Sequence, residues 1–440
     1  MRGIRKRLIV VFIGILMLGV LSLGCVLTAA SAEKTTVTLL SPFPNPSQEP
    51  WTTWVSEILG TISPEVNLKV TTAPWATIKD KLMPAIAAGN PPDIVQLGRP
   101  VFEWAARGYA EPLDELVEAD PEVNPADWYP GVWGDMLYKG HVYALPFESD
   151  SMVFYWNKDY FIEAGLDPEK SPKTWSELDL YTEKLTEKDA TGKYKIIGFI
   201  PWDDRSQEFM HWGWKNGGKF YDPETGRITA ADPQNVKALE WEVSYAKKYG
   251  ATKISTLLQA TAAAGPGGKT INSFTCGLTA MMAGGSFSYS QMDKYAPHIN
   301  YDMTPYLPIP EGGRQAGISA GTLIFVPTGA KGMKEYPEAV WEVMKWYSIV
   351  AMPLWCYQVG DLVSRPEYAN LWMFASDWKV NVSVEALAFS HPWPSVPVLG
   401  FYRDELIAAV EYAIYGQKTP KQALEDVEKS VQAELERIVK

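Results

Sequence analysis

Cysteine and histidine are scarce in this chain. Its 440 residues include three cysteines and four histidines. The histidines, at His141, His211, His298 and His391, are scattered and show no spacing typical of metal ligands. No phosphate-binding loop, dinucleotide fingerprint or zinc pattern is present. The sequence therefore predicts neither a cofactor nor a metal site.

Positive charge is also in deficit, since 40 Lys and Arg stand against 52 Asp and Glu and give a formal net charge of −12. Proteins that bind nucleic acid neutralise phosphates with Lys and Arg, so this balance argues against a nucleic-acid partner. A hydrophobic content of 46% and a charged content of 21% predict a folded chain. The length predicts two or three hydrophobic cores.

The amino terminus has the order of a secretory signal. Four basic residues between Arg2 and Arg7 precede the apolar run Leu8–Leu23, and the small residues Ala30–Ala32 follow. Cleavage after Ala32 is the favoured interpretation, and it changes the formal net charge from −12 to −16 because four basic groups and no acidic group are removed. A retained membrane anchor is the alternative, although the run is short for a membrane span.

The cysteines leave two further questions open. Gly24 before Cys25 fits a lipid-anchoring signal, and Leu21–Leu23 is a loose version of the rest of that signal. Cleavage after Ala32 and lipidation of Cys25 both place the protein outside the cytoplasmic membrane. Cys276 and Cys356 could form a disulfide or remain buried thiols.

Apolar strands alternate with amphipathic helices between Val37 and Leu97. The strands are expected at 37–40, 66–70 and 94–97, and the helices at 51–60 and 78–86. This order predicts a parallel sheet with helices on its faces. Because ligands bind beyond the carboxyl ends of such strands, it selects the loops around Phe43, Trp75 and Arg99.

Two apolar runs, Val142–Pro146 and Met152–Trp156, flank a polar break at Glu148, Ser149 and Asp150. The proline and the polar residues predict an interrupted strand. The whole stretch from Gly140 to Leu178 resembles a passage shared by sugar-type solute-binding proteins of ATP-driven importers, the maltose-binding-protein-like extracellular solute-binding protein family 1. The resemblance implies an α/β, two-lobed periplasmic-binding-protein fold of type II. In that fold each lobe has a mostly parallel sheet flanked by helices, and the ligand lies beside the hinge strands.

Other segments carry the same resemblance. AAGNPPDIVQLGRPVFEWAARGYAEPLDEL and PWDDRSQEFMHWGWKNGGKFYD match stretches that face the cleft, FTCGLTAMMAGGSFSYSQM matches the run with a ligand-stacking aromatic, and GISAGTLIFVPTGA matches the second hinge crossing. The family more often has tryptophan at the stacking position, where this chain has Phe287. A loop around Trp355 and an irregular, proline-broken run through Trp393 and Tyr402 are also expected near the cleft. The ligand-binding residues implied are Phe43, Trp75, Arg99, Glu148, Asp150, Trp202, Asp203, Gln207, Phe287, Ser319, Gly321, Trp355, Trp393 and Tyr402.

The resemblance also implies how the chain is divided. Residues 1–32 form the signal peptide, 33–147 plus about 270–325 the amino-terminal lobe, and 148–269 plus about 326–440 the carboxy-terminal lobe. The second crossing could lie nearer 315–325, with 270–315 shared between the lobes. The protein is expected to be a monomer that closes on its ligand and delivers it to the membrane permease of an ABC importer.

The chain has 18 Trp, 22 Tyr and 15 Phe. Aromatic rings match the C–H faces of a sugar, and carboxylates, amides and Arg match its hydroxyl rim. Core packing alone could explain most of these rings. A secreted carbohydrate-active enzyme, which needs two carboxylates flanking a bound sugar, stays open as an alternative. The same fold could also bind a peptide, a polyol or a phosphate ester, although only Arg99 and Arg205 suggest themselves as phosphate ligands.

Overall fold

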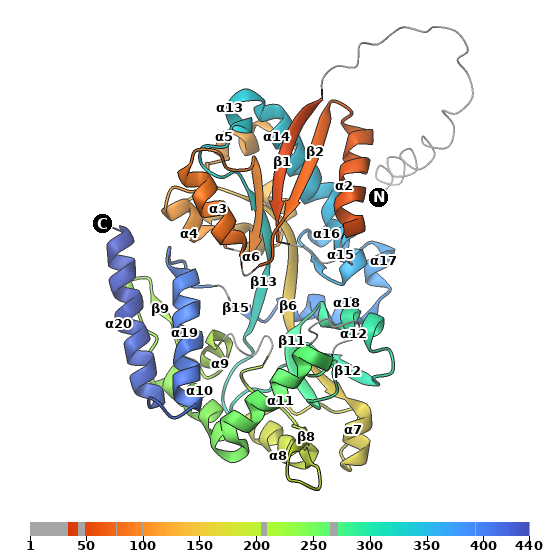
Figure 1. The fold of residues 1–440 in the computed structure, drawn as a ribbon, viewed down its shortest axis with the longest axis vertical. Coiled ribbons are helices and arrows are strands. Elements are labelled where there is room, and N and C mark those ends of the chain that lie inside the picture. The colour runs from red at the N-terminus through yellow and green to blue at the C-terminus, as the bar shows by residue number, and fades with distance from the viewer. Residues whose placement is uncertain are drawn as a thin grey trace, which may run out of the picture.

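A computed structural model describes residues 34–42, 49–75, 77–98, 100–203, 209–264, 272–391 and 393–439, with the backbone alone at 49–54, 260–264 and 439 (Figure 1). The expected signal peptide, Phe43, Arg99 and Gln207 lie outside the described residues. Among the described residues, no helix is both long enough and apolar enough to cross a membrane.

The amino-terminal part has the expected β-α-β-α-β order. Strands β1 (Thr35–Ser41), β2 (Val66–Thr72) and β3 (Ile94–Gly98) are parallel, with β1 in the middle. Helices α2 (Glu49–Ile62) and α3 (Ile78–Ala87) connect them. The alternation of strands and helices along the sequence therefore predicted this unit correctly.

Two strands run side by side through the middle of the molecule (Figure 1). They are β6 (Leu145–Asn157) and β13 (Gly317–Phe325), which pair antiparallel. The expected interruption at the polar residues of β6 is wrong, because β6 is one strand of 13 residues, all of them buried. Pro146 is tolerated where the register with β13 shifts, between Gly321 and Leu323.

These strands lie in the largest sheet of the described residues, which extends into both parts of the molecule. Its order is β11-β6-β13-β3-β1-β2, where β11 is Met281–Gly285, and β12 (Tyr301–Thr304) also pairs with β6. Parallel pairs occur in β1–β3 and between β13 and β15 (Ser390–His391), whereas β6 pairs antiparallel with β11, β12 and β13. The sheet is thus less parallel than expected, because the strands around β6 reverse direction.

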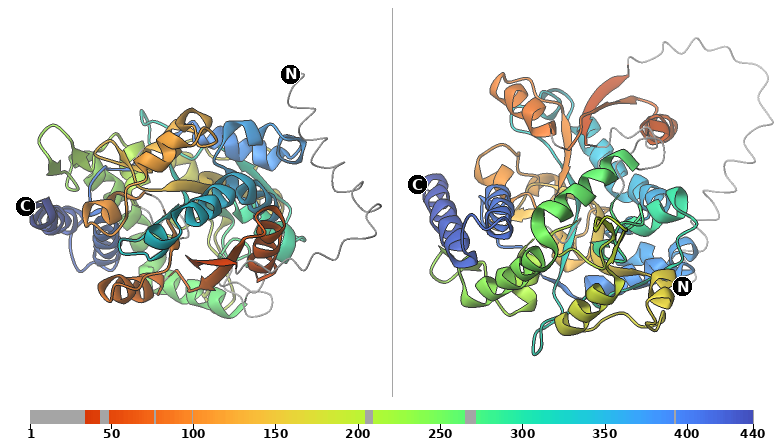
Figure 2. Two further views of the ribbon diagram at one scale, coloured as in Figure 1. Left: turned by 90° about the horizontal axis from the view of Figure 1, so that it is seen from above. Right: turned by 60° about the horizontal axis from the view of Figure 1, so that its bottom comes forward.

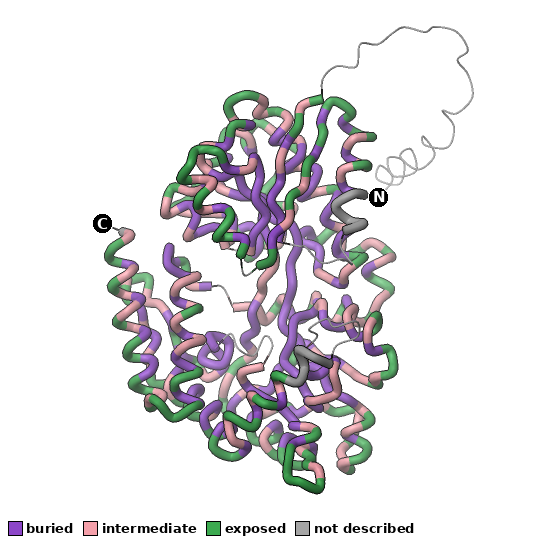
Figure 3. The backbone as a smooth tube through the Cα atoms, in the orientation of Figure 1, coloured by how far each residue is buried: buried purple, intermediate pink, exposed green. Residues whose placement is uncertain are grey.

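Two hydrophobic cores pack on this sheet, and Figure 3 shows the buried strands that run between the upper and lower parts of the molecule. The core that contains Leu39 also reaches Met282 of β11 and Met303 of β12. The amino-terminal core has two faces: Leu39 and Ile94 lie on one, and Leu40 and Val95 on the other. The carboxy-terminal core is rich in aromatic rings, and Trp175 stacks on Trp241 with ring centroids 4.2 Å apart. It is built by α8 (Trp175–Leu185), α9 (Met210–Lys215), α10 (Pro233–Tyr245), α19 (Leu399–Ile414) and α20 (Pro420–Val439).

After β13 the chain packs with the amino-terminal core up to about residue 386. Helices α14 (Pro337–Lys345), α15 (Met352–Val359) and α18 (Trp378–Leu387) add Met344, Trp355 and Val380 to the cluster that contains Leu39. The expected division had instead given 326–440 as a whole to the second lobe. The left panel of Figure 2, seen from above, shows α14 packed beside the amino-terminal strands, and α14 contacts β1.

Capping residues mark the starts of three helices. The Thr174 hydroxyl accepts a hydrogen bond from the Glu177 amide, and Asp232 caps α10 in front of Pro233. Thr419 and Gln422 form a reciprocal capping box before α20, with both backbone N–H groups at 3.2 Å from the side-chain oxygens.

Two local expectations are wrong. Trp355 lies in α15 and not in a loop, and the helix ends at Gly360, which has the left-handed conformation. Tyr402 lies in α19, which starts at Leu399 because no proline follows Pro397 in that stretch. Cys276 and Cys356 do not form a disulfide with each other, and the Cys356 sulfur lies 3.3 Å from the Leu362 carbonyl oxygen.

One carboxylic acid of α10, a helix of the carboxy-terminal core, is buried without a hydrogen-bonding partner among the described residues. Glu242 is 1% exposed, and neither carboxyl oxygen has a partner among the described residues. Burial raises the pKa of Glu242 well above its ordinary value. The folded state then holds this proton more tightly than the unfolded state, so the contribution of Glu242 to stability is most favourable below about pH 4.3 and becomes less favourable as the pH rises above it.

We expect Glu242→Gln to stabilise the protein more at pH 8 than at pH 5, because the amide carries no charge to bury. Each unit of raised pKa is worth about 1.4 kcal/mol. Urea unfolding at both pH values measures the difference. Glu240→Gln, on the exposed side of the same helix, is the control and should change stability equally at both. A gain for Glu242→Gln that is independent of pH would contradict this account.

Candidate functional site

The paired strands β6 and β13, which we call the crossing strands because they pass from one lobe to the other, carry polar side chains at their centre. Ser149, Asp150 and Ser151 of β6 are buried, and each has a partner: Asp150 accepts a hydrogen bond from the Ala320 amide at 2.9 Å, and the Ser151 hydroxyl donates to the Ser383 carbonyl oxygen at 2.7 Å. The Ser149 and Ser364 hydroxyls are 3.4 Å apart. Buried polar groups with partners cost little and replace the apolar packing found on either side.

Side-chain alternation decides which way the carboxylates of β6 point. Met152, Phe154 and Trp156 pack in the carboxy-terminal core, whereas Val153 and Tyr155 pack in the amino-terminal cluster. Successive residues of a strand point to opposite faces. Glu148 and Asp150 are therefore on the same face as Met152. The neighbouring residues Ser319–Gly321 are the partly exposed section of β13.

Glycine is required at position 321 because the backbones of β6 and β13 lie very close together there. Its φ is +134°, and a Cβ at this position would lie 2.2 Å from the Glu148 carbonyl oxygen. The backbones of β6 and β13 approach so closely at this point that no side chain fits. Glycine also adopts this conformation without steric cost.

Trp393 lies against the partly exposed section of β13, and Arg403 lies against the Trp393 ring. The Trp393 indole N–H donates to the Ser319 carbonyl oxygen at 3.0 Å, and the Arg403 guanidinium carbon lies 4.9 Å from the centroid of the Trp393 ring. The Trp393 ring is buried, so it supports Arg403 and leaves little ring surface for a ligand.

A pocket of about 190 Å³ lies between the two cores, and we call it the seam pocket. On the amino-terminal side it is lined by residues that follow the carboxyl ends of β2 and β3, and on the other side by the first turns of α19. A Cβ on Gly98 would lie 3.8 Å from the Trp75 ring and 3.9 Å from the Gly321 carbonyl oxygen, so the ring sits close to the crossing strands. Its lining residues include Trp75, Lys79, Gly98, Glu103, Gly400 and Arg403.

Charged side chains from the amino-terminal side reach α19 across this seam. A Cβ on Gly400 would lie 2.6 Å from a Glu103 carboxyl oxygen and 3.5 Å from the Lys79 ammonium. Next to them, the Arg107 guanidinium is 3.4 Å from the Glu434 carboxylate of α20. Within the described ranges, no three His, Cys, Asp or Glu side chains converge as a metal site. Among the described residues, the lining of the seam pocket thus offers the Trp75 ring, the Glu103 carboxylate and the cations Lys79 and Arg403.

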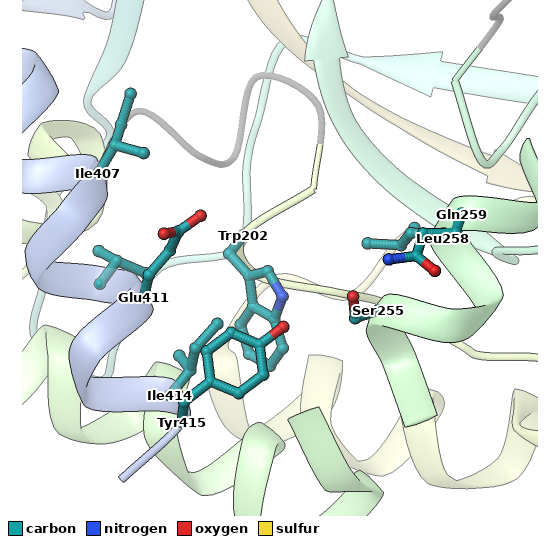
Figure 4. Close-up of a pocket in the computed structure, with 9 residues that line it drawn as sticks. Trp202, Ser255, Leu258, Gln259, Ile407, Glu411, Ile414 and Tyr415 are labelled. Atoms are coloured by element: carbon teal, nitrogen blue, oxygen red, sulfur yellow. The ribbon is translucent and has the colours of Figure 1, made fainter. Parts of the chain in front are cut away.

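A second depression opens in the carboxy-terminal part, between α19 and α11 (Ala251–Ala264). This second pocket has a volume of about 350 Å³, and we call it the α19 groove. Figure 4 shows Trp202 between the two helices, with Ile407, Glu411 and Tyr415 on the α19 side and Ser255 and Gln259 on the α11 side. The neighbouring Asp203 accepts a hydrogen bond from the Ser273 hydroxyl, which in turn lies 2.9 Å from the Thr279 hydroxyl.

The expected site residues therefore divide into groups. Trp75, Gly321, Ser319, Trp393 and the β6 carboxylates lie at or next to the seam. Trp202 and Asp203 lie in the carboxy-terminal part, at and beside the α19 groove. The partly buried Phe287 lies before α12 (Ser288–Tyr295), and a Cβ on Gly285 would lie 2.4 Å from its ring.

Trp355 and Tyr402 do not fit the roles expected of them. Trp355 is buried in the amino-terminal cluster and donates to the Asp361 carboxylate at 2.8 Å. Tyr402 is fully buried, and its hydroxyl donates to the Phe220 carbonyl oxygen at 2.8 Å. Neither ring has a face that a ligand could reach, because both pack in a core.

Sequence reasoning missed Lys79, Glu103 and Arg403. Lys79 and Glu103 are in the first turns of α3 and α4 (Phe102–Ala106), directly after the loops that the parallel-sheet rule had selected. Extending that rule from each loop into the first turn of the next helix would have found both. No sequence signal places Arg403 there, since α19 reaches the seam only through tertiary packing.

The chain was compared with known proteins. A profile of the bacterial extracellular solute-binding protein family matches residues 62–348. The chain belongs to this family. The match covers the seam-pocket residues on the amino-terminal side and both crossing strands, so the resemblance seen in the sequence is confirmed.

Its relatives bind different small polar compounds. The sn-glycerol-3-phosphate-binding periplasmic protein of Salmonella paratyphi A is 28% identical over 61% of this chain and 59% of its own length. The mannitol-binding protein of Pseudomonas aeruginosa is 29% identical over 44% of each chain. The chain thus spans about half the length of these curated relatives.

Solved structures give a longer match. CpMnBP1 with mannobiose bound is 26% identical, covers 90% of this chain and 99% of its own, and superposes with a TM-score of 0.80. A maltose-bound MalE3 of T. maritima, at 20% identity and a TM-score of 0.73, shares the fold. The two-lobed periplasmic-binding-protein fold expected from the sequence is confirmed.

Gly321→Ala should destabilise the protein by about 1–3 kcal/mol, because the new Cβ forces the crossing strands apart at a left-handed backbone position. Gly317→Ala, in the same strand, is the control: its Cβ would meet only ordinary contacts, the nearest at 3.5 Å. Urea unfolding of both variants measures the difference. Equal stabilities would show that the close approach at Gly321 is unimportant.

Proposed function

We propose that this protein binds a sugar or oligosaccharide between its two lobes, closes on it, and delivers it unchanged to the permease of an ABC importer. The observation that carries this proposal is the seam pocket, where Trp75 of one side and Arg403 of the other line the same space. A ligand there contacts both lobes. It therefore binds the closed arrangement better than an open one and shifts the population toward it.

The packing favours a particular division of the chain into lobes. We assign 34 to about 148 and about 322–386 to the amino-terminal lobe, and about 150–318 and about 388–439 to the carboxy-terminal lobe. Residues 322–386 follow the cluster that contains Leu39, and most of the carboxy-terminal lobe follows the other core. The cluster that contains Leu39 also includes Val153, Tyr155, Met282 and Met303, so it continues across the hinge. The assignment differs from the expected division for residues 326–386 and for about 270–318, which the expected division gives to the amino-terminal lobe. The chain would cross the hinge three times, in β6, in β13 and before α19.

The groups at the seam suit a sugar. The Trp75 ring, 48% exposed, offers an aromatic face for C–H groups. Glu103, Lys79 and Arg403 offer charged partners for hydroxyl groups, and hydrogen bonds to charged groups are the stronger ones. Mannobiose and mannitol, which the relatives are named for, are both rich in hydroxyl groups.

A phosphate ester is the second candidate, because two basic side chains, Lys79 and Arg403, line the seam pocket. One relative is named for sn-glycerol 3-phosphate. Glu103 lies near the Lys79 ammonium, and its carboxylate would repel a phosphate. We therefore favour a neutral sugar.

We further propose that the protein acts as a monomer outside the cytoplasmic membrane and performs no catalysis. The family consists of extracellular binding proteins. The expected signal peptide, with cleavage after Ala32 or a lipid on Cys25, would deliver it there. Incubation with oligosaccharides should leave them intact, and chromatography of the mixture checks this. Steady release of shorter products would support the carbohydrate-active enzyme instead.

Trp75→Ala should weaken sugar binding roughly threefold to tenfold, through loss of the aromatic face. Isothermal titration with mannobiose measures the affinity, and glycerol 3-phosphate is titrated in parallel. Trp372→Ala is the control, since this ring is 78% exposed on α17 (Trp372–Ala375) and lines no part of the seam pocket. Binding of glycerol 3-phosphate but not of mannobiose would favour the second candidate, and unchanged affinity in Trp75→Ala would contradict the site.

The Arg107–Glu434 ion pair should favour the closed state, because it joins α4 to α20 across the seam. Arg107→Ala should weaken ligand binding by at most roughly fivefold, as partly exposed pairs contribute little, and enlarge the ligand-free radius of gyration in X-ray scattering. Arg437→Ala is the control, because Arg437 contacts the same Glu434 from within α20. A similar change in both variants would rule out a specific role in closure.

A further inference from the structure

One face of α19 lines both the seam pocket and the α19 groove. Gly400 and Arg403 line the first, and Ile407, Glu411 and Tyr415 line the second. These residues follow one another at steps of three or four, which places them along one side of a helix. The two pockets are therefore arranged one after the other along the same wall.

This wall is longer than one sugar ring. From Arg403 to Tyr415 an α-helix advances about 18 Å. The seam pocket, at about 190 Å³, is smaller than ligand pockets usually are, whereas the α19 groove, at about 350 Å³, is within the usual range of roughly 300–1,000 Å³. A ligand confined to the seam pocket would leave the larger space unused.

The α19 groove has the chemistry of a sugar site. Trp202 and Tyr415 supply two aromatic rings, and Tyr415 is 45% exposed. Glu411, Gln259 and Ser255 supply hydrogen-bonding groups around them (Figure 4). Among the described residues, its lining includes no Lys or Arg, and the Glu411 carboxylate would repel a phosphate. A neutral ligand rich in hydroxyl groups suits this combination.

We infer that the ligand is a linear oligosaccharide of three or more units, which extends from the seam pocket along α19 and places its far end against Trp202 and Tyr415. This inference rests on the proposed function. It adds that chain length is selected by the α19 groove and not by the seam. A disaccharide would occupy the seam pocket and leave Tyr415 without a contact.

The test is isothermal titration of the full protein with linear mannose oligosaccharides of two to five units, and with the matching glucose series. We expect the affinity to rise roughly threefold to tenfold once the chain reaches the groove. Tyr415→Ala and Glu411→Gln should remove most of that rise and leave the affinity for the disaccharide within about twofold. Tyr412→Ala is the control: this ring is 42% exposed on the same helix, contacts Lys418 and does not line the groove.

The outcomes separate the two claims. If disaccharides bind but affinity does not change with length, or if Tyr415→Ala weakens all lengths equally, the extended ligand is wrong and the proposed function stands. If no oligosaccharide of either series binds, both claims fail. A loss in Tyr412→Ala as large as that in Tyr415→Ala would show that the effect comes from α19 as a whole and would also overturn the groove as the site.

Discussion

The backbone pairing of β6 with β13 is the interaction on which the rest of the structure depends. It is the central ladder of the sheet that joins the two hydrophobic cores, and its residues are buried from Leu145 to Asn157. At its centre, serine and aspartate side chains replace apolar ones and form hydrogen bonds with backbone groups. The centre of the ladder therefore joins the two lobes with little hydrophobic packing, and Ser319–Gly321 are partly exposed there.

The close approach of these strands also fixes what surrounds them. Gly321 lets the two backbones touch, Trp75 lies close to that point, and Trp393 is tied to Ser319 by its indole N–H. Arg403 is positioned in turn by the Trp393 ring. A ligand in the proposed seam pocket would divide its contacts between the lobes, and such a division couples binding to closure in a two-state molecule.

Helix α19 has two structural roles. One side of it, with Leu406 and Ala409, packs in the carboxy-terminal core, and the other side faces the seam pocket and the α19 groove. Because the helix begins at the seam and extends away from it, an extended ligand would lie along its exposed side. The core that fixes α19 therefore also sets the direction of the site.

Much of the fold could be predicted from local sequence patterns and from the resemblance to a known family. The strand and helix order from β1 to β3, the helix caps at Thr174, Asp232 and Thr419, and the family itself follow from short-range chemistry and motif spacing. The continuity of β6 could not be predicted, because its polar residues read as a break unless the partner strands that satisfy them are known. Trp355 and Tyr402 were expected in the cleft for a similar reason: an aromatic residue suits a core and a sugar face equally well, and only packing decides between them.

The sequence by itself determined that this is a two-lobed α/β binding protein without metal-ligand patterns, since these properties depend on periodicity, composition and neighbouring residues. Only the tertiary structure decided that Lys79, Glu103 and Arg403 meet at the seam, that residues 326–386 pack with the amino-terminal core, and that one face of α19 connects two pockets. These are contacts between residues hundreds of positions apart. They arise from how the elements pack together, which no local pattern records.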